Sequence, residues 1–220
     1  TEKSGRIARP LATDPVTAAA RIQATINDII YRSAPESAVA VSNVNLRAGD
    51  NTAFVSSYNL ATWYGELGAY PVDVVTGNVR QDAPIWTARD QLDGRDPASR
   101  LIATYDGYTG IPFRWTNLPA AMQSTLMPSG VDADGQALLA WVRGDRSREG
   151  VSLRQRAHLL GDIIDAEPVY VKGAQISLVN PGFTAFQTSI AARTPMVYQA
   201  ANDGMLHAFD AATGVERWAY

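Results

Sequence analysis

Apolar and polar residues alternate most clearly in the last 25 residues of the chain, from Met196 to Tyr220. Three short apolar or aromatic runs lie there: Met196–Ala200, Met205–Phe209 and Val215–Tyr220. Asn-Asp-Gly at 202–204 separates the first two runs, and Asp-Ala-Ala-Thr-Gly at 210–214 separates the second and third. Gly, Asn and Asp tolerate the positive φ angles of tight turns, and Asp and Thr side chains bond the turn backbone. The pattern predicts a three-stranded antiparallel meander.

The turn sequence Asp-x-x-Thr-Gly occurs three times, beginning at Asp73, Asp106 and Asp210. An aromatic run follows each copy, and further alternating runs predict strands at 38–43, 52–58, 66–75, 85–87 and 113–115. Repeats of one turn that each lead into an aromatic strand are typical of propeller blades, although the unequal spacing differs from a regular array. We therefore expect a mainly β fold, a partial and irregular β-propeller.

Helical spacing occurs in the first part of the chain. Asp14 and Pro15 suit the N-cap and first helical position. An apolar stripe then predicts a helix over 15–32, with one face formed by Ala19, Ile22, Ile26, Ile29 and Ile30. A second, shorter helix is expected at 117–126, capped by Asn117. We divide the chain into an N-terminal segment with a connecting helix (1–37), a β-rich region with propeller-like turns and insertions (38–150), and the start of a truncated C-terminal propeller (151–220).

Composition narrows the function classes. The 220 residues are 46% hydrophobic, and 19 basic against 22 acidic side chains give a net charge of −3 without a basic stripe, which argues against a nucleic-acid surface. No apolar run approaches the roughly 20 residues of a transmembrane helix. The absence of Cys excludes disulfides and thiolate metal sites within the chain. The first residues are polar and show no signal peptide. Because the chain does not open with Met and stops at Trp-Ala-Tyr inside a strand pattern, we expect a fragment of a longer protein.

Two short motifs are candidates for binding chemistry. Arg143, Gly144 and Asp145 form the tripeptide of integrin-type adhesion, in which the Arg pairs with a carboxylate and the Asp completes a metal site on the partner. The alternative is a solvated charged loop, in which Asp145 is a turn or cap residue.

The second motif is Asp132-Ala-Asp134-Gly, which resembles the start of a calcium-binding loop because Ca²⁺ prefers several oxygen ligands and Gly allows a sharp bend. The alternative is a solvated turn. His158 and His207 are far apart in sequence, with no third ligand or nucleophile beside either, and for His207 we expect packing with one satisfied ring nitrogen.

Several separate motifs resemble the PilY family of type IV pilus assembly factors and tip-associated adhesins. They occur in the expected order over nearly the whole chain: Val39–Asn43, Tyr58–Asp73, Trp141–Glu149, Leu160–Ile164, Pro168–Val171, Arg193–Tyr198 and Ala201–Asp210. The final blade motif, which ends in Asp210-x-x-Thr-Gly-x-Glu-x-Trp218, resembles a quinoprotein-type propeller blade.

The resemblance implies a non-catalytic protein of the bacterial cell surface, secreted and associated with the pilus or outer membrane. Its expected roles are pilus extension, twitching motility and attachment, with pilins or minor pilins and host-cell surface receptors as partners and calcium as the possible cofactor. One alternative is a quinone-dependent dehydrogenase-type propeller enzyme, although such enzymes typically carry a vicinal Cys pair that this chain lacks. Another is a scaffold for outer-membrane assembly.

Overall fold

The structure is a computed structural model that describes residues 36–41, 51–73, 75–174 and 178–220. The helix expected at 15–32 therefore lies outside the described residues. Residues 35–220 form one compact unit. The described part of this unit is mainly β, with two four-stranded sheets and one two-stranded sheet, none of which is closed. The division of the chain at residues 37 and 150 stays a prediction.

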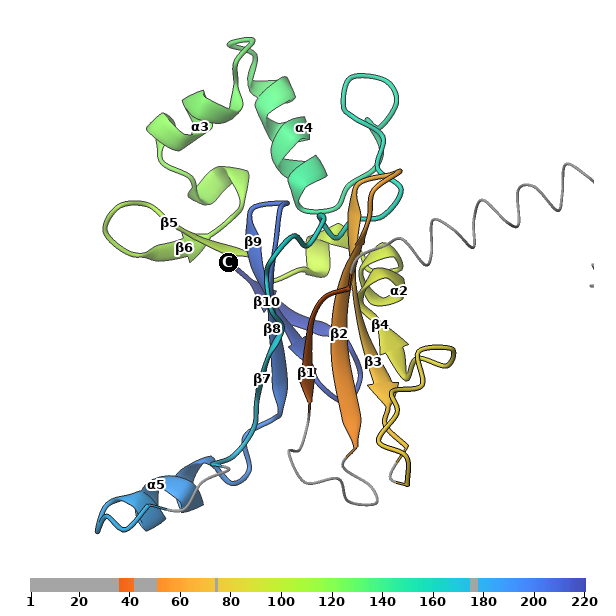
Figure 1. Ribbon diagram of the computed structural model, residues 1–220. Coiled ribbons are helices and arrows are strands. Elements are labelled where there is room, and N and C mark those ends of the chain that lie inside the picture. The colour runs from red at the N-terminus through yellow and green to blue at the C-terminus, as the bar shows by residue number, and fades with distance from the viewer. Residues whose placement is uncertain (1–35, 42–50, 74, 175–177) are drawn as a thin grey trace, which may run out of the picture. The chain divides into compact units, whose positions relative to one another are not determined.

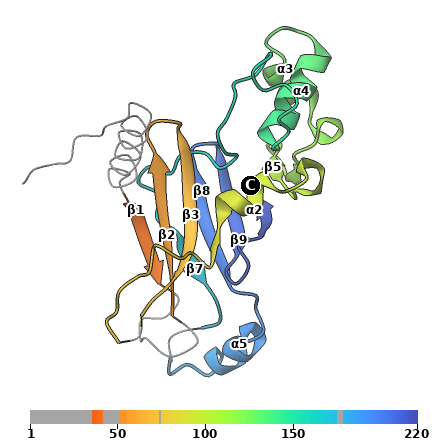
Figure 2. The ribbon, with the colours of Figure 1, turned by 90° about the vertical axis from the view of Figure 1, so that its right-hand side faces the viewer.

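The first sheet is an antiparallel meander whose strands follow the order of the chain (Figures 1 and 2). Thr52 pairs with Pro71 at one end of the longest ladder, and Asn59 pairs with Tyr64 at the other. The strand expected at 52–58 is thereby confirmed, whereas the strand expected at 66–75 lies at Tyr64–Pro71, because a turn begins at Asp73, whose side chain accepts the N–H groups of Val75 and Thr76. The four strands are β1 (Glu36–Val41), β2 (Thr52–Asn59), β3 (Tyr64–Pro71) and β4 (Trp86–Thr87).

The second sheet is also an antiparallel meander, and it contains the three strands predicted from the C-terminal alternation. Met196 pairs with Asp210 and Ala201 pairs with Met205, so the Asn-Asp-Gly turn closes the hairpin as expected. Its strands are β7 (Val169–Val171), β8 (Met196–Ala201), β9 (Met205–Asp210) and β10 (Glu216–Ala219). The excursion between β7 and β8 carries helix α5 (Phe183–Ile190) (Figure 1).

Apolar side chains of the two sheets form one core. Phe54 of β2 stacks on Tyr170 of β7, with the ring centroids 5.1 Å apart. Val197 and Phe209 of the second sheet are fully buried in the same cluster. This shared burial is the hydrophobic contribution that holds the sheets together.

Trp86 fixes the contact between the last strand of one sheet and the last turn of the other. Its indole Nε1 donates a hydrogen bond to the carbonyl oxygen of Ala211 over 3.0 Å. Its ring lies so close to Gly214 that a Cβ there would be 2.5 Å from it. Because Gly214 also has a φ of 73°, the turn needs glycine for both its backbone conformation and its packing.

Two copies of the Asp-x-x-Thr-Gly sequence form the same turn. Asp73 Oδ1 accepts hydrogen bonds from the backbone N–H groups of Val75 and Thr76, each over 2.8 Å. Asp210 Oδ1 accepts equivalent bonds from Ala212 and Thr213. Each turn follows the third strand of its four-stranded sheet. The two sheets therefore carry the same type of turn at the same place.

The third copy belongs to the region inserted between the two sheets. Asp106 closes the two-stranded hairpin of β5 (Ala103–Tyr105) and β6 (Gly110–Pro112). The strand expected at 113–115 is wrong, because Trp115 begins a 3₁₀ turn, η2 (Trp115–Asn117). The other elements of the inserted region are α2 (Ala88–Asp93), η1 (Pro97–Ser99), α3 (Ala120–Leu126) and α4 (Asp132–Val142).

The cap expected for the helix at 117–126 is also wrong. Helix α3 begins after Pro119, and no side-chain hydrogen bond caps it. Asn117 instead belongs to the preceding 3₁₀ turn. Pro119 favours this later start because its fixed φ suits a helix entry while its ring disfavours a helical conformation at Leu118.

Candidate functional site

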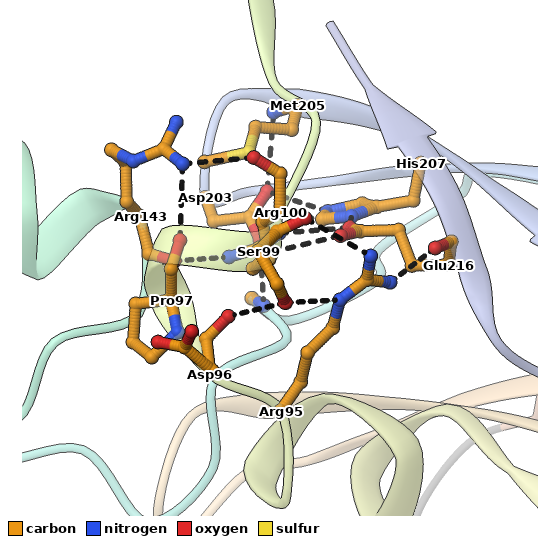
Figure 3. A network of polar contacts seen from close by, with 11 residues as sticks. Arg95, Asp96, Pro97, Ser99, Arg100, Arg143, Asp203, Met205, His207 and Glu216 are labelled. Atoms are coloured by element: carbon orange, nitrogen blue, oxygen red, sulfur yellow. Dashed lines mark hydrogen bonds and ion pairs between the residues drawn. The ribbon is translucent and has the colours of Figure 1, made fainter. Parts of the chain in front are cut away.

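A buried polar cluster lies where the inserted region meets the second sheet (Figure 3). Its members come from four separate segments of the chain: Arg100 after η1, Arg143 after α4, Asp203 in the β8–β9 turn, and His207 and Glu216 on β9 and β10. Arg100, Arg143, His207 and Glu216 are each at most 5% exposed. Charged groups this deeply buried must be paired, since an uncompensated charge would be strongly destabilising.

Glu216 is the centre of the cluster. Arg100 donates to both of its carboxylate oxygens, from Nε and from Nη2, each over 2.8 Å. His207 Nδ1 lies 2.8 Å from the same Oε1 that Nη2 contacts. Burial would raise the pKa of Glu216, but Arg100 and His207 lower it to about 2. The carboxylate is therefore ionised at neutral pH.

His207 bridges two carboxylates. Its Nε2 lies 3.0 Å from Asp203 Oδ2, and its Nδ1 contacts Glu216. Burial would lower the pKa of His207, but Asp203 and Glu216 raise it to about 9. At neutral pH the ring is thus an imidazolium that donates from both nitrogens. The expectation that only one ring nitrogen would be satisfied is wrong, because the second carboxylate comes from the preceding turn.

Arg143 completes the cluster by binding backbone carbonyls. Its guanidinium donates to the carbonyl oxygens of Phe113 (3.0 Å), Pro97 (3.0 Å) and Arg100 (2.8 Å). Arg100 Nη1 donates in return to the carbonyl oxygen of Arg143 over 2.8 Å. These reciprocal bonds tie α4 to the segment that carries Arg100, and Arg100 ties both to β10. The cluster therefore has a structural role, because its hydrogen bonds hold the inserted region against the second sheet.

The predicted adhesion tripeptide overlaps this cluster. Arg143 is 5% exposed and its donors point inward to three carbonyls, and Gly144 is also buried. Asp145 is half-buried, and its Oδ1 accepts a hydrogen bond from the Ser147 N–H over 2.7 Å. Adhesion through Arg143, Gly144 and Asp145 stays a prediction, and it would require Arg143 to leave these acceptors.

The two carboxylates of the predicted calcium motif lie in the first turn of α4. Asp132 and Asp134 are both exposed, and Ser129 Oγ donates to Asp134 Oδ2 over 2.8 Å. Acidic side chains at this position stabilise a helix by interacting with its N-terminal N–H groups. No group of three or more His, Asp or Glu side chains with metal-binding geometry occurs among the residues that the structure describes. Calcium binding here stays a prediction.

Asp203 also lines a pocket of about 190 Å³. Trp63 and Trp141 supply its aromatic lining, and Asp162, Asn202 and Arg154 supply polar groups from the segments around them. We call it the Trp63 pocket. Unlike the buried cluster, it opens to solvent, because Trp63 is 55% exposed and Asn202 and Arg154 are also exposed.

Sequence reasoning missed both sites because their members are distant in the chain. Arg100 and Glu216 are separated by 116 positions. A signal was present only for His207 and Glu216, which flank the Asp210 turn on two strands that the alternation predicted. Even there, the register of the β9–β10 pairing shifts between Glu216 and Trp218. The alternation of apolar and polar residues therefore does not indicate that His207 and Glu216 come together.

The described residues thus define a mainly β protein whose stacked antiparallel sheets carry a clamped insertion. In an alignment 192 positions long that covers 80% of the chain, it is 34% identical to the type IV pilus biogenesis factor PilY1 of Pseudomonas aeruginosa strain UCBPP-PA14. A PilY1 homolog of Xylella fastidiosa is 36% identical over 72% of the chain. PilY1 of Pseudomonas aeruginosa strain PAK is 30% identical over 95% of the chain.

These matches show that the chain belongs to the PilY family, as its motifs indicated. The chain spans 13–20% of the length of these curated relatives. No protein-family model matches the chain, and no solved structure matches it. None of the described helices is long and apolar enough to cross a membrane.

Proposed function

We propose that the chain is the propeller-side part of a non-catalytic type IV pilus biogenesis factor that supports pilus extension, twitching motility and surface attachment. The observation that carries this proposal is the match to PilY1 of Pseudomonas aeruginosa over 80% of the chain, at 34% identity. The buried polar cluster supports a structural role for these residues, because their side chains bind one another and the backbone.

The two four-stranded meanders support a propeller architecture. Consecutive propeller blades are four-stranded antiparallel sheets that pack face to face. Here β1–β4 and β7–β10 share one core, and each carries an Asp-x-x-Thr-Gly turn after its third strand. In this proposal they are successive blades of an irregular propeller, and residues 88–168 are an insertion between them.

The proposed location is the bacterial cell surface, where the protein is secreted and associated with the pilus or outer membrane. Pilins or minor pilins are its proposed partners, and host-cell receptors are a second class for the adhesive role. Calcium is a proposed cofactor that rests on the family resemblance.

The test is made on the source cells. Pili are sheared off and the sheared fraction is probed for the intact protein, alongside a strain that lacks its gene. We expect the protein in that fraction, and we expect pili and twitching to be lost in the deletion and restored by the wild-type gene. Normal pili in the deletion strain, with no protein in the sheared fraction, would contradict the proposal.

A matched pair of variants links this test to the described residues. Glu216→Gln breaks the buried cluster, whereas Arg217→Gln changes the neighbouring residue, whose side chain is 55% exposed. We expect Arg217→Gln to restore pili in the deletion strain. Glu216→Gln should restore them poorly, because the insertion loses its attachment to the sheet.

A further inference from the structure

We propose that the Trp63 pocket is a binding site for a single neutral sugar residue, which stacks on Trp63 and bonds the Asp162–Asn202 pair. This inference goes beyond pilus biogenesis, since it assigns a ligand to a part of the protein for which that role needs none.

The first observation is the backbone conformation of Trp63. Its φ is 53°, in the left-handed region. This region costs a residue with a side chain about 1–2 kcal/mol, and for a bulky aromatic residue it is an outlier. Glycine or asparagine would occupy the position without that strain. A strained residue of this kind indicates function when the fold does not need its side chain.

The fold holds Trp63 in this conformation without burying its ring. Asn59 Oδ1 accepts hydrogen bonds from the N–H groups of Ala61 and Thr62, and the Asn59 carbonyl accepts the N–H of Trp63 over 2.9 Å. The β2–β3 turn is therefore locked by its backbone and by Asn59. The Trp63 side chain remains 55% exposed at the edge of the pocket. Its contribution to the core is small, so packing does not explain why Trp occupies the position.

The polar lining has the chemistry of a hydroxyl-binding site. Asn202 Nδ2 donates to Asp162 Oδ2 over 2.7 Å, and the Asn202 backbone N–H donates to the Asp162 carbonyl oxygen. This pairing fixes the two side chains against each other. Asp162 keeps its second carboxylate oxygen, Oδ1, and Asn202 keeps its single amide oxygen, Oδ1, and two neighbouring acceptors suit two neighbouring hydroxyl groups. The apolar C–H face of a sugar ring suits an exposed indole, which combines a large apolar face with a polar edge.

The charged side chains that line the pocket favour a neutral ligand over an ionic one. The basic side chains of the lining are Arg154, Arg156 and His158, and the acidic ones are Asp162 and Asp203. Most of these charges are already paired outside the pocket or at its wall: Arg156 with Glu149, His158 with Asp93, and Asp203 with His207. An anion would face Asp162, and a quaternary ammonium ion would face Arg154. A neutral ligand with many hydroxyl groups avoids both conflicts.

The size of the pocket limits the ligand to one residue. A volume of about 190 Å³ corresponds to about six water molecules. Such a space suits a single sugar ring, and a longer glycan would extend past Trp63 into solvent. Trp141 also lines the pocket, and Arg156 covers one face of its ring, with the guanidinium carbon 4.0 Å from the ring centroid.

The experiment uses the intact protein purified from the source cells. Glucose, galactose, mannose, fucose and N-acetylglucosamine are titrated separately, and binding is followed by saturation-transfer NMR and by tryptophan fluorescence. We expect at least one sugar to bind with a Kd on the order of 1 mM, as suits a small open site. Inorganic phosphate and tetramethylammonium serve as the anionic and cationic probes, and we expect neither to compete.

Trp63→Gly separates binding from folding. The variant removes the stacking surface and relieves the backbone strain, so we expect sugar affinity to fall at least tenfold while the melting temperature stays unchanged or rises. Trp63→Asn, which also tolerates positive φ, should behave in the same way. Trp218→Phe is the matched control, because Trp218 is also partly exposed (38%) but lies outside the pocket.

Several outcomes would overturn the proposal. They are no binding of any of the five sugars at concentrations on the order of 100 mM, binding of phosphate or tetramethylammonium in their place, unchanged sugar affinity in Trp63→Gly, or a clear fall in the melting temperature of that variant. Pilus assembly by the Trp63→Gly strain is measured in parallel. Normal pili with lost sugar binding would support this inference, whereas loss of pili in the gene deletion tests the pilus role independently.

Discussion

The buried polar cluster and the Trp63 pocket meet at Asp203, and they use similar residues in opposite ways. In the cluster, Arg100, His207 and Glu216 satisfy one another and are at most 3% exposed. In the pocket, Asp162 and Asn202 are paired once and keep acceptor atoms toward an open space. Polar groups whose hydrogen bonds are made within the protein stabilise the structure. Polar groups that keep an acceptor for a further hydrogen bond can bind a ligand. The two sites contain similar residue types. They differ in how fully their polar groups are hydrogen-bonded within the protein and in how open they are to solvent.

The strain in the two regions differs in the same way. Gly214, beside the core, adopts its positive φ without steric cost and admits the ring of Trp86. Trp63, at the pocket, adopts a similar φ in spite of its side chain. The core uses glycine where the backbone requires it, whereas the pocket keeps an aromatic residue where glycine would be easier. The following predictions test this contrast, from the largest effect to the smallest.

Glu216→Gln should be the most damaging change. It leaves Arg100 and His207 buried without their common anion, and breaking a buried ion pair in this way costs about 3–5 kcal/mol. Urea unfolding of the intact protein measures the loss. Hydrogen exchange at Ile102 and Ala219 locates it, because these residues form a β-bridge between the inserted region and β10. Arg217→Gln is the control and should cost less than about 1 kcal/mol, since the Arg217 side chain is 55% exposed and the buried Asp210 keeps its hydrogen bonds from the N–H groups of Ala212 and Thr213. Equal effects of the two variants would contradict the role of the cluster in holding the inserted region to the second sheet.

Stability should depend on pH through His207 and Glu216. The pKa of His207 is raised from 6.5 to about 9, so its contribution is complete below pH 6.5 and is lost as the pH rises to 9. The pKa of Glu216 is lowered from 4.5 to about 2, so its contribution is complete above pH 4.5 and is lost as the pH falls to 2. Unfolding free energies measured across this range should be highest between pH 4.5 and 6.5. His207→Gln should flatten the alkaline side, and an unchanged slope there would contradict the assignment.

Arg143→Lys tests whether the adhesion tripeptide is structural. An ammonium group cannot reach three carbonyls in fixed directions, so we expect a loss of about 1–3 kcal/mol. Asp145→Ala removes only the bond to Ser147 and should cost about 1 kcal/mol. Binding of both variants to integrin-bearing cells is measured beside their stability. If Asp145→Ala keeps its fold and loses cell binding, the adhesion hypothesis gains support, and unchanged binding in both variants would remove it.

Asp132→Asn and Asp134→Asn should have the smallest effects. Each removes one negative charge from the first turn of α4, which costs about 0.3–1 kcal/mol. Thermal melts with and without calcium separate this helix effect from metal binding. If calcium raises the wild-type midpoint and fails to raise that of either variant, the calcium prediction is supported. Equal midpoints with and without calcium in all three proteins would leave only the helix effect.

Local patterns were sufficient for the strands and for much of the turn chemistry. The apolar runs and the turn residues that bound them placed β2, β8 and β9 within a residue or two. The Asp-x-x-Thr-Gly sequence specified its own turn at Asp73 and at Asp210, because the Asp carboxylate bonds N–H groups only two and three residues away. The family resemblance was also available from the sequence, since it rests on ordered motifs along the chain.

The two sites were decided by the tertiary structure. Arg143 stood in an apparently solvated charged segment, yet its guanidinium lies inside the protein, because the carbonyls it binds belong to residues 30 to 46 positions away. Trp63 gave no local signal of strain, because φ depends on how the β2–β3 turn closes. Strand positions, local turns and family membership could be inferred from the order of the residues alone. Packing of distant segments decided which polar groups became saturated and which remained open, because hydrogen-bond satisfaction depends on neighbours that only the fold brings together.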